Sequence, residues 1–281
     1  MDIQALEKQA RQVRRDIITM VSKAGAGHPG GSLSCTDALV ALYFEIMNVD
    51  PANDKDPNRD RFVLSKGHAA PALYGTLCER GYFGREEFDR FRQLHGILQG
   101  HPDTKKCPGV DASTGSLGQG ISIAVGMALG AKHTGNPCHV YTVVGDGESQ
   151  EGIVWEASMA AAHYHLDNLT VILDHNGMQI DGTNDEVMSL GDIKAKALSF
   201  GYDVIEVADG KAVCHNGNYT DLKGAPAPVK KTEKGQTYRV VEPFTNWATR
   251  KKYAKGEKVT IGESDMPGFK DAIEKGKLRK V

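Results

Sequence analysis

Two apolar segments that flank one helical segment constrain the fold of this chain most. The runs "CHVYTVVGD" and "NLTVILD" have the pattern of buried strands, and "EGIVWEASMAAAHYH" between them has the pattern of a helix. In a right-handed strand–helix–strand unit the carboxyl ends of the two strands lie side by side. Because "RFVLS" and "DVIEV" add further strands among helical segments, the sequence predicts an α/β fold with a parallel sheet and helices on both faces.

Acidic and amide groups follow these two strands. Asp146 comes directly after the first strand and Asn176 follows the second. Carboxylate and amide oxygens suit Mg²⁺ or Ca²⁺, and a backbone with glycine at Gly145 and Gly147 can approach a phosphate closely. Either polar residue alone would more often be a helix cap or a turn residue. The pair with its glycines predicts a site for a cation and a phosphate.

Three histidines stand beside glycine at predicted element boundaries. His28 lies in "AGAGHPGG", His68 in "LSKGHAA" and His101 in "LQGHPDT". A lone histidine is more often a packing or surface residue. Three in this setting favour a functional cluster, since a neutral imidazole donates to an oxyanion and moves protons near pH 7. Nearby, Ser34 with Asp37 three residues later is typical of a helix N-cap.

Charge changes sign along the chain. Residues 211–281 contain 16 Lys and Arg and 8 Asp and Glu, which gives a net charge of +8. Residues 1–210 contain 18 Lys and Arg and 28 Asp and Glu, which gives a net charge of −10. We therefore expect a domain over 1–210, a linker or extended loop over 211–237 that is rich in Gly, Pro and Lys, and a small basic β-rich module over 238–281. In that module "TYRVVEPF" and "EKVTIGE" read as strands and "GFKDAIEKGKLRKV" as a short amphipathic helix.

Composition excludes several classes of function. No apolar run approaches the roughly 20 residues that a membrane helix requires, and the start of the sequence reads as a polar amphipathic helix rather than a signal peptide. The five cysteines are scattered without CxxC spacing, which is typical of reduced thiols in the cytoplasm. A basic tail binds nucleic acid in some proteins, but few aromatic residues accompany this one, and a solvated surface is the favoured interpretation.

The motifs together resemble transketolase. "GAGHPGG", "LSKGHAA", "GHP", "STGSLGQG", "GDGESQEG" and the Asn of "DHNGMQIDG" occur in the order seen in the N-terminal, diphosphate-binding half of that family, over roughly residues 5–210. The resemblance implies the thiamine-diphosphate-binding fold with thiamine diphosphate and Mg²⁺ or Ca²⁺ as cofactors. It also implies transfer of a two-carbon ketol unit from a ketose phosphate to an aldose phosphate, as in the pentose phosphate pathway.

The resemblance also implies roles for individual residues. Asp146 and Asn176 would bind the cation through their side chains and Met178 through its carbonyl. His68 would contact a phosphate oxygen, and His28 and His101 would face the sugar. The remaining cofactor contacts implied are Gly115, Ser116, Leu117, Gly147 and Ile180, and the implied interface carboxylates are Glu151 and Glu156.

The sequence departs from the family after Gly210. No position matches the family's late "WHG" histidine, and the family's other half, which carries the glutamate that activates the aminopyrimidine, has no counterpart here. We therefore expect the partner to be a separate C-terminal transketolase subunit, in a dimer of heterodimers, with no membrane or nucleic-acid partner. The alternatives are another thiamine-diphosphate enzyme of the dihydroxyacetone synthase type and a non-catalytic binding or assembly subunit with a replaced C-terminal segment.

Overall fold

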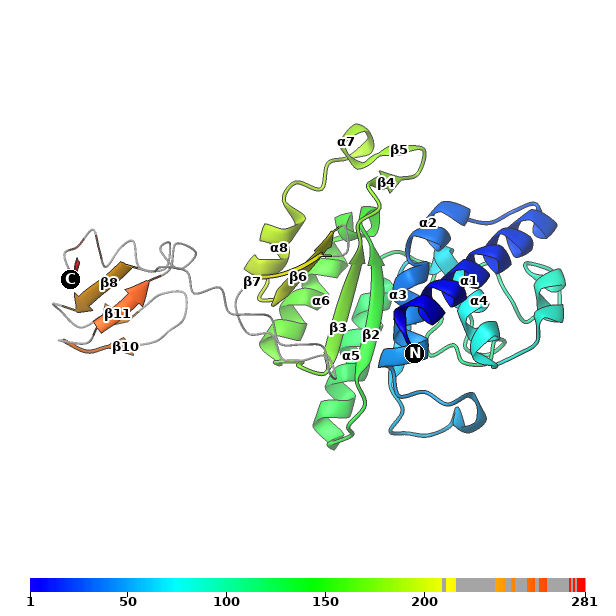
Figure 1. The fold of residues 1–281 in the computed structure, drawn as a ribbon, viewed down its shortest axis with the longest axis horizontal. Coiled ribbons are helices and arrows are strands. Elements are labelled where there is room, and N and C mark those ends of the chain that lie inside the picture. Colours follow the sequence, from blue (N-terminus) through cyan, green and yellow to red (C-terminus); the bar gives the residue numbers. More distant parts are fainter. Residues whose placement is uncertain are drawn as a thin grey trace. The chain divides into compact units, whose positions relative to one another are not determined.

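The protein forms two compact units in the computed structural model, Met1–Ala225 and Pro226–Val281 (Figure 1). Its backbone is described for residues 1–208, 211–215, 236–240, 244–245, 252–255, 258–261, 273, 275 and 277–280. The first unit extends past residue 210, where the charge changes, so the domain boundary expected there stays a prediction.

The first unit contains all the long helices among the described residues. The helix α1 begins after Asp2, whose carboxylate accepts from the Ala5 amide, and it ends at Gly25 in the left-handed conformation. The α-helices are α1 (Ile3–Ala24), α2 (Pro29–Ser34), α3 (Thr36–Ala41), α4 (Ala70–Arg80), α5 (Gln119–Thr134), α6 (Gly152–His163), α7 (Asn184–Val187) and α8 (Ile193–Ser199). Shorter 3₁₀ or π turns are η1 (Leu42–Ile46), η2 (Pro51–Asn53), η3 (Gly67–Ala69), η4 (Arg85–Arg90) and η5 (Gly147–Gln150).

The predicted helix cap at Ser34 is wrong. Cys35 precedes α3, no side chain caps that helix, and Ser34 is the last residue of α2. The Ser34 hydroxyl instead donates to the Asp174 carboxylate, 140 residues away in the sequence. Asp37 pairs with Arg14 of α1. Both side chains of the apparent capping motif thus bond residues that are distant in the sequence.

The central sheet confirms the predicted parallel arrangement. It contains β1 (Arg61–Leu64), β2 (Val140–Gly145) and β3 (Leu169–Asp174) in the order β1-β2-β3, all parallel. Gly145 at the end of β2 is in register with Asp174 at the end of β3. The carboxyl ends of the two strands therefore lie side by side, as the strand–helix–strand pattern predicts.

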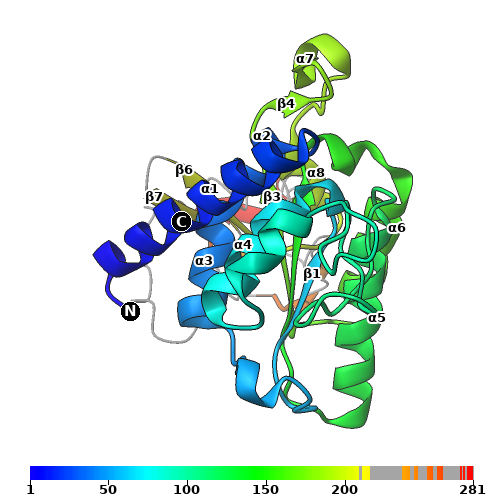
Figure 2. The same ribbon diagram turned by 90° about the vertical axis from the view of Figure 1, so that its right-hand side faces the viewer.

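Helices cover both faces of this sheet, as predicted (Figure 2). Alternate residues of β1 separate into two cores: Phe62 and Leu64 pack with α1, α3 and α4, whereas Val63 packs with α5 and α6. The same alternation divides Tyr141 from Val140 in β2. A strand with both faces buried has no polar face, which explains the continuous apolar runs in the sequence.

One predicted strand of the parallel sheet pairs elsewhere. The segment "DVIEV" forms β6 (Val204–Ala208), which pairs antiparallel with β7 (Lys211–His215) in a two-stranded sheet. Residues 211–215 were expected to belong to a linker, and residues 216–235 lie outside the described part. The pair Asp209–Gly210 between the strands is a frequent hairpin sequence, a signal that the sequence interpretation missed.

The second unit is rich in strands, as expected. Strand β8 (Gln236–Val240) pairs antiparallel with β11 (Lys258–Ile261) and with β12 (Leu278–Lys280), and β9 (Phe244–Thr245) pairs with β10 (Lys252–Tyr253). The helix expected over residues 268–281 is wrong at its end, because β12 is a strand. Most of the remaining positions in that segment lie outside the described residues.

Two further features bear on the expectations from composition. Cys35, Cys78, Cys107 and Cys138 are free and buried, and the fifth cysteine, Cys214, has no described side chain. Among the residues that the structure describes, no helix is long and apolar enough to span a membrane.

Candidate functional site

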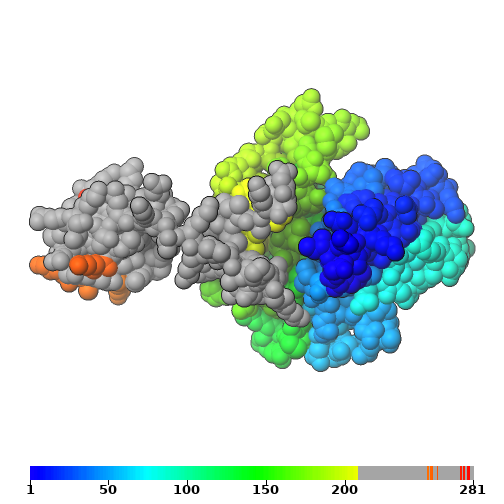
Figure 3. Space-filling model, in the orientation of Figure 1, coloured from blue at the N-terminus to red at the C-terminus, as the bar shows by residue number. Residues whose placement is uncertain are grey.

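The residues singled out from the sequence come from segments at the carboxyl ends of the parallel strands. In Figure 1 the arrows of β2 and β3 point toward the end where α2 lies and where the chain makes an excursion through β4 (Met178–Gln179), β5 (Gly182–Thr183) and α7. This excursion, yellow-green in Figure 3, forms the edge of the first unit. Ligands of open parallel sheets bind at this end of the strands.

The three predicted histidines lie close together. The rings of His28, at the start of α2, and His68, in η3, are 5.4 Å apart between centroids and nearly perpendicular. His101 lies in a loop, and a Cβ added to Gly115 would be 3.1 Å from its ring. Residues far apart in the sequence thus gather at one end of the sheet.

Two of these imidazoles are neutral near pH 7. Burial, followed by the charge of Lys66, lowers the pKa of His68 to about 4. Burial also lowers the pKa of His101, with a further contribution from Arg92. A neutral imidazole can donate one hydrogen bond and accept another, the property needed to contact a phosphate or sugar oxygen and to move a proton.

Two glycines bring loop backbones into close contact beside His68. A Cβ on Gly67 would lie 2.7 Å from the Gly115 nitrogen, so residue 67 tolerates no side chain there. Gly115 has φ of 155°, and Ser116 and Leu117 after it are exposed. The backbone of Gly115–Leu117 is therefore available to an incoming ligand, as the resemblance implies.

Asp146 is the buried centre of the predicted cation site. Its side chain is 2% exposed. One oxygen accepts from the Gly147 amide at 2.9 Å. The other accepts from the Gly177 amide and from the Asn184 side chain, each at 2.7 Å. Three donors fix the carboxylate in place, and an ionised carboxylate with about four lone-pair positions has capacity left for a cation.

Asn176 and Met178 join Asp146 through the same loop. The Gly177 amide that bonds Asp146 lies between them, and the Met178 amide donates to the Asn176 side-chain oxygen at 2.9 Å. A carboxylate, an amide oxygen and a backbone carbonyl are hard oxygen ligands, so this set fits Mg²⁺ or Ca²⁺. In the described part of the chain no group of three His, Cys, Asp or Glu side chains could hold a metal, and a set with a single carboxylate agrees with that finding.

Ile180 has an unusual conformation. It has φ of 51°, in the left-handed region that a β-branched residue rarely adopts, and its side chain is 88% exposed. Such backbone strain costs of order 1–3 kcal/mol and clusters at ligand sites. The conformation presents an apolar side chain next to residues 176–178, which carry predicted cation ligands and which we call the cation loop. An apolar ring of a ligand could cover this side chain.

Sequence reasoning missed Glu148, which connects three segments beneath the site. It is 3% exposed and accepts from Ser65 at 2.6 Å, from the Gly118 amide at 2.8 Å and from the Gly145 amide at 2.9 Å. Burial raises the pKa of this carboxyl. A signal was present in the sequence, since "GDGE" places a second acidic residue directly after a strand end, but only the fold brings its three donors together.

A buried ion pair was also missed. Lys66 is only 1% exposed and its ammonium pairs with Asp174, the last residue of β3. The same ammonium donates to the Gly31 carbonyl at 2.6 Å. Lys66 lies inside the "SKGH" motif, so its position was visible in the sequence, but its partner 108 residues away was not.

The remaining predicted carboxylates, Glu151 and Glu156, are exposed at the start and in the middle of α6. The structure describes a single chain and leaves their assignment to an interface a prediction. Exposed apolar residues of α5 and α6, Ile123 at 37% and Met159 at 53%, provide apolar surface that another chain could cover.

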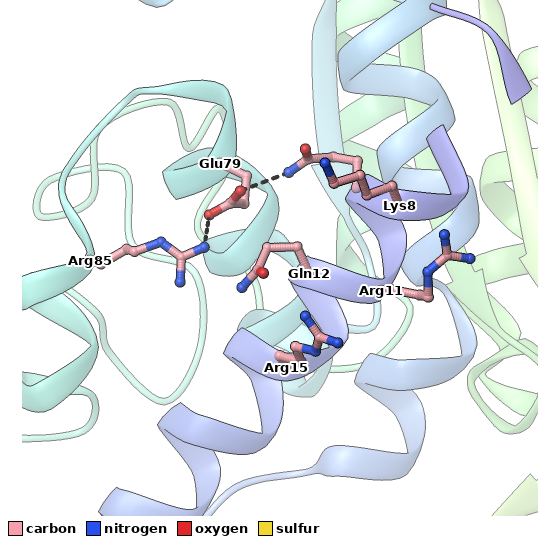
Figure 4. Close-up of a pocket in the computed structure, with 7 residues that line it drawn as sticks. Lys8, Arg11, Gln12, Arg15, Glu79 and Arg85 are labelled. Atoms are coloured by element: carbon pink, nitrogen blue, oxygen red, sulfur yellow. Dashed lines mark hydrogen bonds and ion pairs between the residues drawn. The ribbon is translucent and has the colours of Figure 1, made fainter. Parts of the chain in front are cut away.

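Two surface hollows differ in their relation to these residues. One of about 480 Å³ is lined by His101 and its neighbours, among them Gln99, Asp103 and Ser113. Another of about 530 Å³ lies between α1, α4 and η4, where Glu79 binds Gln9 and Arg85 (Figure 4). None of the predicted site residues lines the second hollow, so we assign the site to the strand ends. The second hollow is lined by Lys8, Gln9, Arg11, Gln12, Arg15, Glu79 and Arg85.

Comparison with known protein families identifies the chain's relatives. Residues 6–219 match the model of the family described as "Transketolase, thiamine diphosphate binding domain". This match covers more than half of the chain and ends within the first compact unit.

Individual relatives agree with the family match. An apulose-4-phosphate transketolase subunit of Phocaeicola vulgatus is 42% identical over 252 residues, covering 88% of this chain and 89% of the relative. The 6-deoxy-6-sulfo-D-fructose transketolase subunit SqwG of a Clostridium species is 46% identical over 199 residues, covering 71% and 72%. Among solved structures, transketolase from Leishmania mexicana superposes with a TM-score of 0.70 at 33% identity over 72% of this chain. This chain covers only 32% of that larger chain.

Proposed function

The chain belongs to the transketolase family through its thiamine-diphosphate-binding domain, and we propose that it is the diphosphate-binding subunit of a split transketolase. In this proposal it takes part in the transfer of a two-carbon ketol unit from a ketose phosphate to an aldose phosphate. Its cofactors are thiamine diphosphate and Mg²⁺, or Ca²⁺ in its place, and it acts in the cytoplasm, in agreement with the free thiols of the described cysteines.

One observation carries the proposal: a fixed set of oxygen donors and three clustered histidines meet at the same strand ends. Asp146 is held by three hydrogen bonds, and the loop of Asn176 and Met178 is bonded to it directly. His28 and His68 stand next to each other, with His101 beside Gly115. A chain that had kept only the fold, without catalysis, would have no physical requirement for the histidines.

The cofactor would be held at three places. Asp146, Asn176 and the Met178 carbonyl would hold the cation, which in turn neutralises the diphosphate. His68, neutral because of burial, would donate to a phosphate oxygen, and the Gly115–Leu117 backbone and Gly147 would approach the cofactor closely. Ile180 would pack its exposed side chain against the ring.

Thiamine diphosphate, when bound, supplies the carbon nucleophile and the electron sink that carbon–carbon cleavage requires. The residues of this chain orient the sugar and handle protons. His28 and His101 would face the sugar hydroxyls, where a neutral imidazole accepts a proton from one oxygen and returns it to another. Burial lowers the pKa of His101, which favours the neutral form of that imidazole.

We propose that a second chain completes the site, because Met178, Ile180 and Leu117 expose apolar surface around the predicted cofactor position. We propose that the partner is a C-terminal transketolase subunit, in a dimer of heterodimers, with Glu151 and Glu156 at an interface. Two relatives are themselves named as transketolase subunits, which supports this arrangement.

The test is an assay of the purified chain with and without a candidate C-terminal subunit. Ribose 5-phosphate serves as acceptor, with xylulose 5-phosphate, apulose 4-phosphate and 6-deoxy-6-sulfo-D-fructose as separate donors, because relatives are named for the last two. Mg²⁺ and thiamine diphosphate are present throughout. We expect turnover with both chains present and none with this chain alone.

Each outcome discriminates between parts of the proposal. Robust turnover by the single chain would contradict the need for a partner. Binding of cofactor and partner without turnover of any donor would favour a non-catalytic role. Absence of Mg²⁺-dependent thiamine diphosphate binding, even with the partner, would overturn the proposal.

A further inference from the structure

A continuous chain of polar contacts runs from Lys66 to the predicted cation ligand Asn176. The Lys66 ammonium pairs with Asp174, and the Ser34 hydroxyl donates to the same carboxylate oxygen at 2.5 Å. The Asn176 side-chain nitrogen in turn donates to the Ser34 oxygen at 3.4 Å. Four side chains thus connect the segment after β1, the end of β3, the end of α2 and the cation loop.

The direction of each hydrogen bond in this chain is determined by chemistry. An ammonium only donates, and an ionised carboxylate only accepts. Ser34 has one proton, and two acceptors lie within its reach, the Asp174 oxygen at 2.5 Å and the Gly31 carbonyl at 3.2 Å. The lone pairs of Ser34 therefore remain for donors, which are Lys66 at 3.4 Å and the Asn176 amide nitrogen.

The same argument orients the amide of Asn176. Because Ser34 accepts, the NH₂ end of Asn176 must face it, and the carbonyl oxygen must face the other way. The opposite contact agrees, since the Met178 backbone N–H can only donate and lies 2.9 Å from that oxygen. The oxygen keeps a second lone pair for a cation.

The ion pair at one end of this chain of contacts is buried, whereas Ser34 and Asn176 are exposed. Lys66 is 1% and Asp174 13% exposed in their side chains, so the pair is largely removed from water. A buried ion pair contributes little net stability over apolar side chains of similar size, and such pairs are better explained by the specificity they impose. Here the pair determines that the Ser34 hydroxyl donates to Asp174 and accepts from Asn176.

We propose that Lys66, Asp174 and Ser34 are positioning residues that hold the Asn176 amide with its oxygen toward the cation. The proposal rests on the function proposed above, because it takes Asn176 as a cation ligand. It adds residues that touch neither cation nor sugar in that scheme. It also connects the cation loop to α2, the helix that begins directly after His28.

The test measures Mn²⁺ affinity of the full chain at a fixed, saturating concentration of thiamine diphosphate, from the electron paramagnetic resonance signal of free Mn²⁺. Ser34→Ala removes the acceptor, and we expect the Kd for Mn²⁺ to rise about tenfold, the lower range for loss of a group that orients a metal ligand. Ser34→Thr keeps the hydroxyl, and we expect it to restore affinity to within about twofold of the wild type, given the same orienting bond.

Asp174→Ala tests the direction of the Ser34 hydrogen bond. The Asp174 oxygen that accepts from Ser34 is then absent, so the Ser34 proton can bond the Asn176 oxygen and turn it from the cation. We expect Kd to rise about 10- to 100-fold, with no further loss in the Asp174→Ala, Ser34→Ala double variant, because the first change has already broken the orientation.

Ser32→Ala is the matched control. Ser32 lies in the same helix and donates to the His28 carbonyl at 2.7 Å, outside the chain of contacts, so its loss should leave Mn²⁺ affinity unchanged. The melting temperature of each variant, measured without cation and cofactor, shows whether a change in Mn²⁺ affinity comes from lost stability of the fold rather than from the orientation of Asn176. A loss of affinity in Ser34→Ala that is matched by Ser32→Ala, or not restored by Ser34→Thr, would overturn the proposal.

The outcome is distinguishable from failure of the proposed function. If the wild type binds no Mn²⁺ with thiamine diphosphate, or if Asp146→Ala binds it equally well, the cation site itself is wrong. If those two behave as expected and Ser34→Ala retains wild-type affinity, only the positioning role is wrong.

Discussion

The candidate site has two parts that differ in burial and in backbone conformation. The base of the site, which we define as Lys66, Asp146, Glu148 and Asp174, lies at the ends of the parallel strands, and these side chains are almost fully buried and multiply bonded. The rim, which we define as Leu117, Met178 and Ile180, lies on loops and exposes 36%, 54% and 88% of each residue.

The difference shows which part is complete before any ligand binds. Every carboxylate of the base already has donors, so the folded chain by itself arranges the charges that the proposed cation and diphosphate require. The rim instead exposes apolar surface and holds Ile180 in a costly conformation, which is reasonable only if a ligand or another chain covers it. Substitutions in the base should therefore abolish binding of thiamine diphosphate and Mg²⁺, whereas substitutions in the rim should only weaken it.

The largest expected effect comes from the base. In Asp146→Ala and Asp146→Asn we expect the Mg²⁺-dependent affinity for thiamine diphosphate to fall by more than about 100-fold, because loss of a direct charged ligand exceeds the effect of losing an outer contact. Calorimetric titration with Mg²⁺ and cofactor measures this. Asp185→Ala is the control, since Asp185 is an exposed carboxylate of α7 that accepts a hydrogen bond from Ser189. Unchanged affinity in both Asp146 variants would remove the base from the site.

A smaller effect on cofactor affinity is expected from the rim. Two variants of Ile180 distinguish the packing of its side chain against the cofactor from the strain of its backbone. Ile180→Ala and Ile180→Gly should each weaken cofactor binding about tenfold through lost apolar contact. Glycine tolerates φ of 51°, so Ile180→Gly should raise the free energy of unfolding of the free chain by about 1 kcal/mol relative to Ile180→Ala. Urea unfolding and calorimetry measure the two quantities. Equal stability of both variants would show that the conformation carries no strain.

His68 connects base and rim and predicts a dependence on pH. Its pKa is lowered from 6.5 to about 4 in the folded protein, first by burial and then by Lys66. Between these values the unfolded chain binds a proton that the folded chain does not, so stability is present above pH 6.5 and is lost as pH falls toward 4.

We therefore expect the wild type to lose about 1 kcal/mol more stability than His68→Gln between pH 7 and pH 5, after allowance for partial exposure of the ring. Urea unfolding at both pH values measures this difference. Burial raises the pKa of Asp16 to about 6, so its contribution to stability has the opposite pH dependence. This contribution cancels in the comparison because the wild type and His68→Gln both contain Asp16. An equal loss in the two chains would show that His68 is solvated.

The smallest effect is expected from the second unit. All predicted site residues precede residue 181, and the first compact unit ends at Ala225. A chain that ends at residue 225 should bind thiamine diphosphate and Mg²⁺ within about twofold of the full chain, since the charges that set that affinity lie in the first unit. Loss of cofactor binding on truncation would mean that the site depends on residues beyond the base and rim.

The sequence alone predicted the parallel sheet, the helices on both of its faces and the polar residues that follow its strand ends. This was possible because the information is local. Continuous apolar runs with polar ends specify buried strands, and Asp146, Asn176 and the three histidines each stand within a short glycine-containing motif. The resemblance to transketolase, which rests on the same motifs, is confirmed by the family match.

Tertiary structure decided the pairings between distant segments. Strand β6 has the composition of another parallel strand, but it pairs with β7 instead. Ser34 has the pattern of a helix cap, but it binds Asp174, 140 residues away. Lys66 stands in a short local motif, but its partner is the same aspartate, 108 residues away. Local patterns specify what a segment can form, whereas its partner depends on the free energy of burying polar groups together, and that is determined only when the strands meet.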